Sequence, residues 1–555
     1  MLSSRLSEST RAFRDAFANP ALRRLELALA GSVVGDWAFA VALAVYTFHQ
    51  GGATALGVVS MARWLLAAAA APFVSVLADR YPRRWVMMSA DLLRAVTVAA
   101  AAMVVWSGGP ASVVYALAIL TSIVSTAFPP AQTALIPSLT KTPAELTAAN
   151  VVTSSIESVG TFAGPAIGGI LLATTGAGTV FALDAATFVW SLLLVAAIHA
   201  PDDNPQPSET AAPAGLVSEV LAGFRVVAGD RRLRLIIGLF GAQTVVSGAL
   251  TVLIVVMAID LLSLGNGGVG TLNASVGVGG VLGSLVAFAL VGRGKLASDF
   301  ALGLLLWGVP IAVVGVWVNA PVAIAMLVLV GVGNTLVDVA GLTLLQRVVP
   351  DEVLGRVFGV LESVFAATIG LGAVTAPLLI HVAGVRGALL MVGALLPLLA
   401  AATWPMLAGI DRGAADPGRL ALLRRVPFMA PLSEATLERL CGQLAPLFVA
   451  AGETVFAAGD RGDRFYLIES GEVEVVNEHG VLAHLGEGSF FGEIALVRDV
   501  PRTASIRVRD DAKLLALDRD EFIAAVTGHA PSAAAAEAVV SARMTGLRPG
   551  LGRTS

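Results

Sequence analysis

Long apolar stretches dominate the first 410 residues and constrain the fold more than any other feature. A transmembrane helix needs about 20 consecutive apolar residues, and twelve stretches reach that length. They are 24–48, 54–78, 85–107, 111–137, 146–174, 178–200, 234–262, 267–291, 299–318, 321–348, 356–381 and 385–409. Only 14% of the residues are charged, against about 25% in soluble proteins. The sequence therefore predicts an α-helical, multi-pass protein of the cell membrane with twelve transmembrane helices in contact with the lipid bilayer.

Basic residues lie mainly in alternate loops and set the expected orientation. The 78–85 loop, ADRYPRRW, contains three arginines, whereas the opposite loops are nearly free of basic residues apart from Arg386. The other basic loops contain Arg225, Arg231, Arg232, Arg234, Arg293, Lys295 and Arg356. Because such loops face the cytoplasm, both termini are expected to be cytoplasmic. The first 20 residues lack the apolar core of a signal peptide and are expected to form an amphipathic helix.

Two changes in composition divide the chain. A polar segment, PDDNPQPSETAAP, opens the long loop after the sixth span, and another polar stretch follows Ile410. The expected parts are a six-helix half at 1–200, a cytoplasmic linker with an amphipathic helix at 201–233, a second six-helix half at 234–410, a linker at 411–421, a separate domain at 422–530, and a C-terminal helix and tail at 531–555. Two repeated halves would place a substrate site between them near the midplane of the membrane.

The C-terminal region has the pattern of a small α+β domain with a β-roll. Amphipathic helices, the second with Ser433 as a plausible N-cap, precede short alternating segments separated by glycine turns, which is typical of strands. The expected strands are 447–456, 463–470, 471–478, 481–488, 504–509 and 513–518. Gly459, Gly462 and Gly471 are interpreted as turns of the roll.

The loop between spans two and three, SVLADRYPRR, resembles a signature of the major facilitator superfamily, whose fold is two six-helix halves. Asp79, Arg80, Arg83 and Arg84 match the pattern, while Ser75 and Pro82 stand where the family has glycines. The resemblance implies a charged latch that holds one transport conformation. The alternative is an ordinary basic loop that only sets orientation.

The segment GTFAGPAIGG in span five resembles the signature of drug:proton antiporters in that superfamily. Glycines allow two helices to approach closely, and a proline removes a backbone hydrogen bond and favours a bend. The matching residues are Gly160, Gly164, Pro165, Gly168 and Gly169. The alternative is helix packing through small residues without any antiport function.

Further segments, including GDW in span one, ADLLRA in span three and FPPAQTALIP in span four, resemble the macrolide-efflux-like branch of those antiporters. The resemblance implies export of small, amphipathic molecules driven by protons, and it leaves the substrate open. A lipid flippase of the same fold is one alternative. A membrane receptor that binds a ligand without transport is another.

Ionisable side chains inside spans are costly and are therefore candidates for function. Asp36, Arg63, Glu157 and Asp338 are the candidates for proton coupling or transport. A carboxyl group that is protonated on one side and ionised on the other can carry a proton, and Asp36 and Glu157 are the first choices. Asp36 and Arg63 lie at similar depths and could pair, which would give Asp36 a structural role instead. Asp91 and Arg94, one turn apart, are interpreted as a structural pair.

Residues 491–504 contain a second chemical pattern, FGEIAL followed by PRTA. An arginine can hold a phosphate through a charge-assisted bidentate contact. A glycine lets the backbone approach a ligand, and the N–H groups of a short helix can bind phosphate oxygens. The pattern resembles the phosphate cassette of the cyclic nucleotide-binding domain, at Phe491, Gly492, Glu493, Ile494, Ala495, Arg502, Thr503 and Ala504.

The resemblance implies that Arg502 binds the cyclic phosphate and that Glu493 accepts a hydrogen bond from the ribose 2′-hydroxyl. cAMP is favoured as the regulatory ligand, but Thr503 also resembles the hydroxyl residue of cGMP-preferring domains, so cGMP stays possible. A degenerate roll that no longer binds is the alternative, and the presence of both Glu493 and Arg502 argues against it.

Several function classes are not supported by the sequence. The chain has one cysteine, Cys441, and no metal-ligand spacing among six histidines. It has neither a P-loop nor a nucleophile elbow, so we expect no enzyme, no metal and no direct use of ATP. A net charge of −4 does not favour nucleic-acid binding. The oligomeric state stays open.

Overall fold

The computed structural model describes residues 18–140, 142–198, 223–290, 295–349, 351–412, 417–432, 434–478 and 480–546. The expected N-terminal amphipathic helix, Ser433 and most of the 201–233 linker lie outside these residues. The chain divides into two compact units. The membrane unit comprises Met1–Leu345 and Asp351–Leu407, and the C-terminal unit comprises Gln346–Pro350 and Ala408–Ser555.

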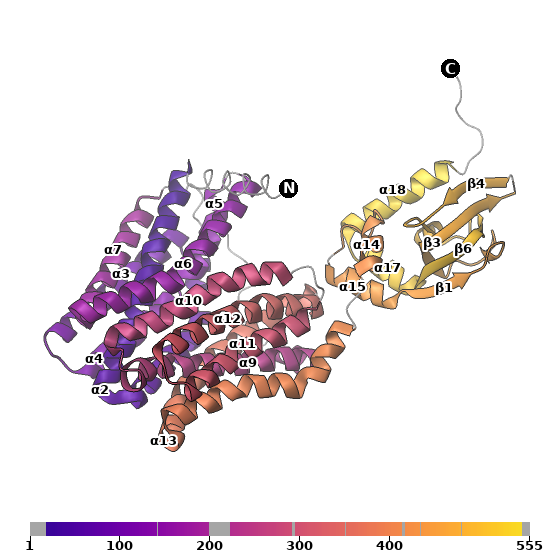
Figure 1. The fold of residues 1–555 in the computed structure, drawn as a ribbon. Coiled ribbons are helices and arrows are strands. Elements are labelled where there is room, and N and C mark those ends of the chain that lie inside the picture. Colours follow the sequence, from indigo (N-terminus) through magenta and orange to yellow (C-terminus); the bar gives the residue numbers. More distant parts are fainter. Residues whose placement is uncertain are drawn as a thin grey trace. The chain divides into compact units, whose positions relative to one another are not determined.

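The membrane unit is a bundle of helices (Figure 1). Its elements are α2 (Pro20–Arg80), α3 (Arg83–Trp106), α4 (Ala111–Ser125), α5 (Phe128–Leu139), α6 (Pro143–Thr175), α7 (Ala177–Ala196), α9 (Arg231–Val256), the π-helical turn η1 (Met257–Leu261), α10 (Gly265–Leu290), α11 (Leu296–Val316), α12 (Ala320–Val348) and α13 (Asp351–Arg412).

In the described part of the chain, 10 helices are long and apolar enough to cross a membrane. Two of them, α2 with 61 residues and α13 with 62, contain a backbone break. The breaks are at Gly51–Gly52 and at Gly384, where Gly52 and Gly384 have φ of +64° and +69°. Glycine adopts this left-handed conformation readily, so the chain turns there and each long element supplies two spans. The helices therefore accommodate the twelve predicted spans.

The fourth predicted span, 111–137, is not one continuous helix. It is divided into α4 and α5, with Thr126 and Ala127 between them. Pro129 and Pro130 follow at once. Proline has no N–H to donate and disfavours helical geometry at the residue before it, which explains the interruption.

The C-terminal unit packs helices against an antiparallel sheet (Figure 1). The sheet order is β1-β6-β3-β4, with β2 paired to β6 and β5 paired to β3. The elements are α14 (Pro417–Arg425), α15 (Glu434–Gln443), β1 (Ala445–Val449), β2 (Thr454–Phe456), β3 (Arg464–Asn477), β4 (Gly480–Leu485), β5 (Phe490–Phe491), α16 (Glu493–Arg498), β6 (Ser505–Asp518), α17 (Arg519–Thr527) and α18 (Ala530–Gly546).

Alternation along the strands builds two cores. Phe465 and Leu467 of β3 pack with the helices, whereas Tyr466 and Ile468 point into the roll. Successive strand residues face opposite sides of a sheet, so one strand serves both cores. The same alternation places Phe490 on the helix side and Phe491 on the roll side.

Two pairs of predicted strands are continuous in the structure. Segments 463–470 and 471–478 form β3, and 504–509 and 513–518 form β6. The register between β3 and β6 shifts from Ile468 to Val473. Gly471 in this irregular stretch has φ of +91°, and an added Cβ would lie 2.5 Å from the Asp511 carbonyl oxygen. The glycine therefore bends the strand at a bulge instead of ending it.

Candidate functional site

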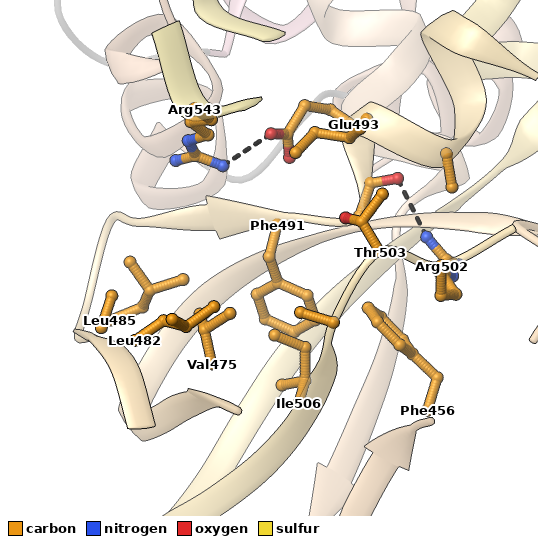
Figure 2. Close-up of a pocket in the computed structure, with 15 residues that line it drawn as sticks. Phe456, Val475, Leu482, Leu485, Phe491, Glu493, Arg502, Thr503, Ile506 and Arg543 are labelled. Atoms are coloured by element: carbon orange, nitrogen blue, oxygen red, sulfur yellow. Dashed lines mark hydrogen bonds and ion pairs between the residues drawn. The ribbon is translucent and has the colours of Figure 1, made fainter. Parts of the chain in front are cut away.

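A pocket of about 290 Å³ lies in the roll of the C-terminal unit, where β5, α16 and the start of β6 meet. Its lining includes every predicted cassette residue, namely Phe491, Gly492, Glu493, Ile494, Ala495, Arg502, Thr503 and Ala504. Figure 2 shows Glu493 on one side of the pocket, with Thr503 and Arg502 beyond it. Residues that are separated along the chain by positions 496–501 therefore line a single cavity.

Gly492 is required at this position for two reasons. Its φ is +89°, which favours glycine. An added Cβ would lie 2.8 Å from Arg502 Nη1 and 3.0 Å from the Arg464 carbonyl oxygen. A side chain at residue 492 would therefore strain the backbone and displace the arginine.

Arg502 is held in a defined position, and its side chain is 2% exposed. Nη1 donates to the Gly492 carbonyl at 2.9 Å, and Nη2 donates to the Arg464 carbonyl at 2.8 Å and to Asp463 Oδ1 at 3.2 Å. The guanidinium carbon lies 4.1 Å from the centroid of the Phe456 ring (Figure 2), a cation–π contact. These contacts aim a permanent positive charge at the pocket.

Burial lowers the pKa of the Arg502 guanidinium from its ordinary value, because burial disfavours the charged form. Its Nε atom is buried and has no hydrogen-bond partner among the described residues. A buried cation with an unused N–H is stabilised by an anion. The site therefore has the chemistry to bind one compact anionic group.

Glu493 is 1% exposed and forms an ion pair with Arg543 of α18, at 2.8 Å between Oε1 and Nη1. Figure 2 shows the two groups facing each other. Burial raises the pKa of the Glu493 carboxyl, and Arg543 opposes this rise. The second oxygen, Oε2, is buried without a partner in the described part of the chain. It can accept a hydrogen bond from a ligand hydroxyl.

Arg543 and an apolar wall were not predicted from the sequence. Arg543 lies in the alanine-rich C-terminal helix, and it lines the pocket with Val475, Leu482 and Leu485. Nothing near Arg543 in the sequence resembles a binding pattern, so only the folding of α18 against α16 could reveal it. The apolar wall of the pocket can hold a flat, uncharged ring.

The membrane unit has a second candidate site, a cavity of about 580 Å³ lined by residues of both halves. Glu157 of α6 and Asp338 of α12 are the charged residues among its lining, and both are acids. Trp37, Asn273, Trp307, Asn334 and several serines and threonines complete the polar part of the lining.

Asp338 is oriented by a hydrogen-bonded chain. The Asn334 amide nitrogen donates to Asp338 Oδ2 at 2.9 Å. The Asn334 oxygen accepts from Gln243 at 3.1 Å and from the Trp307 indole at 3.0 Å. Because both donors bind the oxygen, the amide orientation is fixed and its N–H points to Asp338.

Asp36 and Arg63 are not among the residues that line this cavity, and the ion pair that they could have formed is replaced by other contacts. Asp36 instead forms an ion pair with Arg94, at 3.8 Å. Arg63 donates to Ser122 at 2.9 Å and lies 5.9 Å from the Phe39 ring centroid. Equal depth in a membrane does not specify which faces of two helices meet.

Other buried charges have clear partners. Asp91 and Arg94 form the predicted hydrogen-bonded pair. Glu26, which was not predicted, is 2% exposed and accepts from Thr153 at 2.9 Å, while its Oε2 has no partner among the described residues. An acid inside the predicted span 24–48 was the available signal, but Glu26 lies at the edge of that span.

The glycine signature in α6 packs directly against α2. Added Cβ atoms at Gly160, Gly164 and Gly168 would lie 2.2 Å from Val33 Cγ1, 2.5 Å from Trp37 Cβ and 2.7 Å from Ala38 Cα, respectively. Gly169 faces the other half of the bundle, because its added Cβ would lie 2.7 Å from Gly270 Cα. Pro165 lines the cavity. Close helix contact is thus the physical role of these glycines.

The predicted latch is only partly described. The Asp79 side chain lies outside the described side chains, and Arg80 is exposed. Arg84 donates to the Ala196 carbonyl at 2.6 Å, and Arg83 also has an interaction partner. The latch function of this loop stays a prediction.

Comparisons with known proteins match both units. The Major Facilitator Superfamily model matches residues 25–299, and the Cyclic nucleotide-binding domain model matches residues 446–529. The C-terminal region is 39% identical over 102 residues to a cAMP-dependent protein kinase regulatory subunit of Yarrowia lipolytica, covering 18% of this chain and 27% of the relative. The same subunit of Schizosaccharomyces pombe is 37% identical over 103 residues, covering 18% and 25%. The chain thus spans about a quarter of these relatives.

A solved POT family transporter, in complex with a thioalcohol conjugated peptide, matches with a TM-score of 0.56 and 13% identity. The match covers 70% of this chain and 96% of the transporter, and at this identity it shows the fold alone. With its apolar helices, the chain is a multi-pass membrane protein. Residues 25–299 therefore belong to the Major Facilitator Superfamily, and residues 446–529 form a cyclic nucleotide-binding domain.

Proposed function

We propose that this protein is a proton-coupled exporter of small amphipathic molecules in the cell membrane, controlled by cAMP that binds its cytoplasmic C-terminal domain. The observation that carries the proposal is that all eight cassette residues line one pocket in a chain that also has a transporter fold. The domain boundaries at 200, 233, 410, 421 and 530 are part of the proposal.

The pocket chemistry supports a cyclic nucleotide. A cyclic phosphate has one negative charge, which suits the buried Arg502, whose Nε has no partner among the described residues. The ribose 2′-hydroxyl is a donor for Oε2 of Glu493, which also has no partner in the described part of the chain. The apolar wall accommodates the base, and Thr503 lies in the same lining. The regulatory subunits similar to this region are named for cAMP, which favours cAMP over cGMP.

The cavity chemistry supports proton-coupled transport. One acid from each half faces the same space, so a change in the arrangement of the halves changes the surroundings of both. Asp36, whose ion pair with Arg94 lies outside this cavity, stays a further candidate for proton coupling. A regulatory ligand shifts a transport equilibrium only if it binds one state more tightly, so cAMP must distinguish two arrangements of the chain.

The first experiment measures thermal unfolding of the purified full-length protein with cAMP, cGMP or 5′-AMP. A ligand at 100 times its Kd adds about 2.7 kcal/mol to the stability of the state that it binds. We expect the largest rise in melting temperature with cAMP, a smaller one with cGMP, and none with 5′-AMP, which lacks the cyclic diester. The sensor proposal fails if none of the three changes the melting temperature.

The second experiment measures proton movement in proteoliposomes with ethidium as the amphipathic probe. Wild-type protein is expected to move protons across the membrane in the direction opposite to ethidium. Glu157→Gln and Asp338→Asn are expected to reduce the proton flux and the ethidium flux to those of protein-free liposomes. Asp260→Asn is the matched control, because Asp260 is an exposed acid in η1 that is not among the cavity lining. Ethidium movement without proton movement in the wild type would contradict proton coupling.

A further inference from the structure

The N-terminal half of the membrane unit contains a cluster of buried charges that is separate from the cavity. It consists of Asp36 on α2, Asp91 and Arg94 on α3, and Asp184 on α7. None of these four residues is among the cavity lining. Ionisable side chains at this depth are expensive to bury, so their charges must be balanced inside the protein.

The positive charge of Arg94 and the negative charge of Asp91 balance each other. Arg94 is 3% exposed, Asp91 is fully buried, and they form an ion pair. The Asp91 Oδ2 atom also accepts from Ser191 at 2.7 Å. The Arg94 guanidinium carbon lies 4.8 Å from the Phe128 ring centroid and 4.3 Å from that of Phe188. Two aromatic rings and one carboxylate thus hold this guanidinium in place.

The other two acids of the cluster, Asp36 and Asp184, share the remaining, weaker contacts with cations. The Asp36 side chain is 43% exposed, and its Oδ2 lies 3.8 Å from Arg94 Nη1. That distance permits an ion pair but is too long for a hydrogen bond. Arg63, the second cation that acts on Asp36, donates its Nε hydrogen bond to Ser122. Asp36 therefore has accessible surface and only a long contact with Arg94.

Asp184 is the least satisfied acid of the cluster. It is 1% exposed, and its Oδ1 accepts a long hydrogen bond of 3.3 Å from Thr187. Its Oδ2 is buried and has no partner among the described residues. Asp36 and Arg94 both act on it electrostatically, with opposite signs. An ionised carboxylate in this position would lack a hydrogen-bonded cation.

Gly35 brings Asp184 to Asp36. A Cβ at residue 35 would lie 2.4 Å from Asp184 Oδ1 and 2.4 Å from Thr187 Oγ1. Carbon atoms do not approach oxygen so closely, so only glycine at this position lets the Asp184 carboxyl rest on the backbone of α2. The residue that follows in the chain is Asp36, and its carboxyl group interacts electrostatically with that of Asp184.

The charges of the cluster do not balance without a proton. Three acids face Arg94 and the more distant Arg63, and Arg94 is already bonded to Asp91. Burying an unpaired carboxylate costs several kcal/mol, and a buried acid without a cation neutralises by binding a proton. Asp184 is almost fully buried and has the weakest polar contacts of the three acids, so it is the acid that binds this proton.

We propose that Asp184 and Asp36 form a carboxylic acid–carboxylate pair that carries the coupled proton. In this proposal the proton resides on Asp184 and exchanges with the Asp36 carboxylate, whose side chain is 43% exposed. Arg94 is a positioning residue that holds Asp36 near Asp184. The role in coupling rests on the proposed function, whereas the protonation of Asp184 does not.

Infrared difference spectroscopy of the full-length protein in liposomes tests where the proton resides. At pH 7 the wild type is expected to show a C=O stretching band of a protonated carboxyl group, which shifts in D₂O and disappears in Asp184→Asn. Asp260→Asn is the control and should leave the band unchanged. Gly35→Ala keeps every acid but should shift the frequency, because the added Cβ displaces the Asp184 carboxyl. An unaltered band in Asp184→Asn would overturn the proposal.

The ethidium assay tests the coupling. Asp184→Asn is expected to let ethidium equilibrate without proton movement, at a rate that no longer depends on the pH gradient. Proton movement at the wild-type rate in this variant would also overturn the proposal. If the wild type moved no ethidium, the proposed function would fail for this probe, whereas the infrared band would still decide the state of Asp184.

Discussion

Replacing Arg502 with alanine is expected to lower the affinity for cAMP by a factor between about 100 and about 4,000. Removal of one partner from a buried ion pair costs about 3–5 kcal/mol, and each 1.4 kcal/mol is a factor of ten. The Arg502 side chain is 2% exposed, so water cannot replace it well. Isothermal titration of the full-length protein with cAMP measures the change.

Two further variants separate the loss of the ligand contact from a loss of folding. Arg502→Lys keeps the charge but loses the fork that donates to Gly492 and Arg464, so its affinity should lie between those of the wild type and the alanine variant. Arg509→Ala removes an exposed arginine of β6, which is paired with Glu472 at 3.3 Å, and this variant should bind cAMP normally. Normal binding by Arg502→Ala would show that this arginine does not contact the phosphate.

The second large effect is expected from Gly164→Ala, which should destabilise the membrane unit and abolish ethidium transport. The new Cβ would lie 2.5 Å from Trp37 Cβ and 2.9 Å from the Val34 carbonyl oxygen. Overpacking of a core by a single group lowers the stability of the folded state by about 1–3 kcal/mol. Because a backbone atom is among the contacts here, the clash cannot be relieved by a side chain alone, and the helices α2 and α6 must separate. Both contribute to the cavity through Trp37 and Glu157.

Gly238→Ala is the matched control, because an added Cβ at this helical position meets nothing within 4 Å. Thermal unfolding in detergent is expected to show a lower melting temperature for Gly164→Ala and no decrease for Gly238→Ala. Equal melting temperatures and equal transport would mean that the bundle tolerates separation of α2 and α6, and that the glycine signature does not act through close packing.

The predictions from sequence succeeded where a signal is local. The twelve apolar stretches follow from length and hydropathy, since a membrane requires both. The eight cassette residues lie within 14 consecutive positions, and all line one pocket. In the same domain, however, the strand boundaries differed from the predicted ones. Gly471 was predicted to be a turn between two strands, but it lies at a bulge inside β3.

The sequence by itself determined the two classes of unit, the apolar stretches of the membrane unit, and the grouping of Arg502 and Glu493 in one short pattern whose residues line one pocket. Only the tertiary structure decided which charges meet. Asp36 pairs with Arg94 instead of Arg63, Glu493 pairs with Arg543 from 50 positions away, and Asp184 rests on Gly35. Partner choice depends on how each helix is rotated about its axis and on which small residues let backbones approach, and packing of the whole bundle sets both.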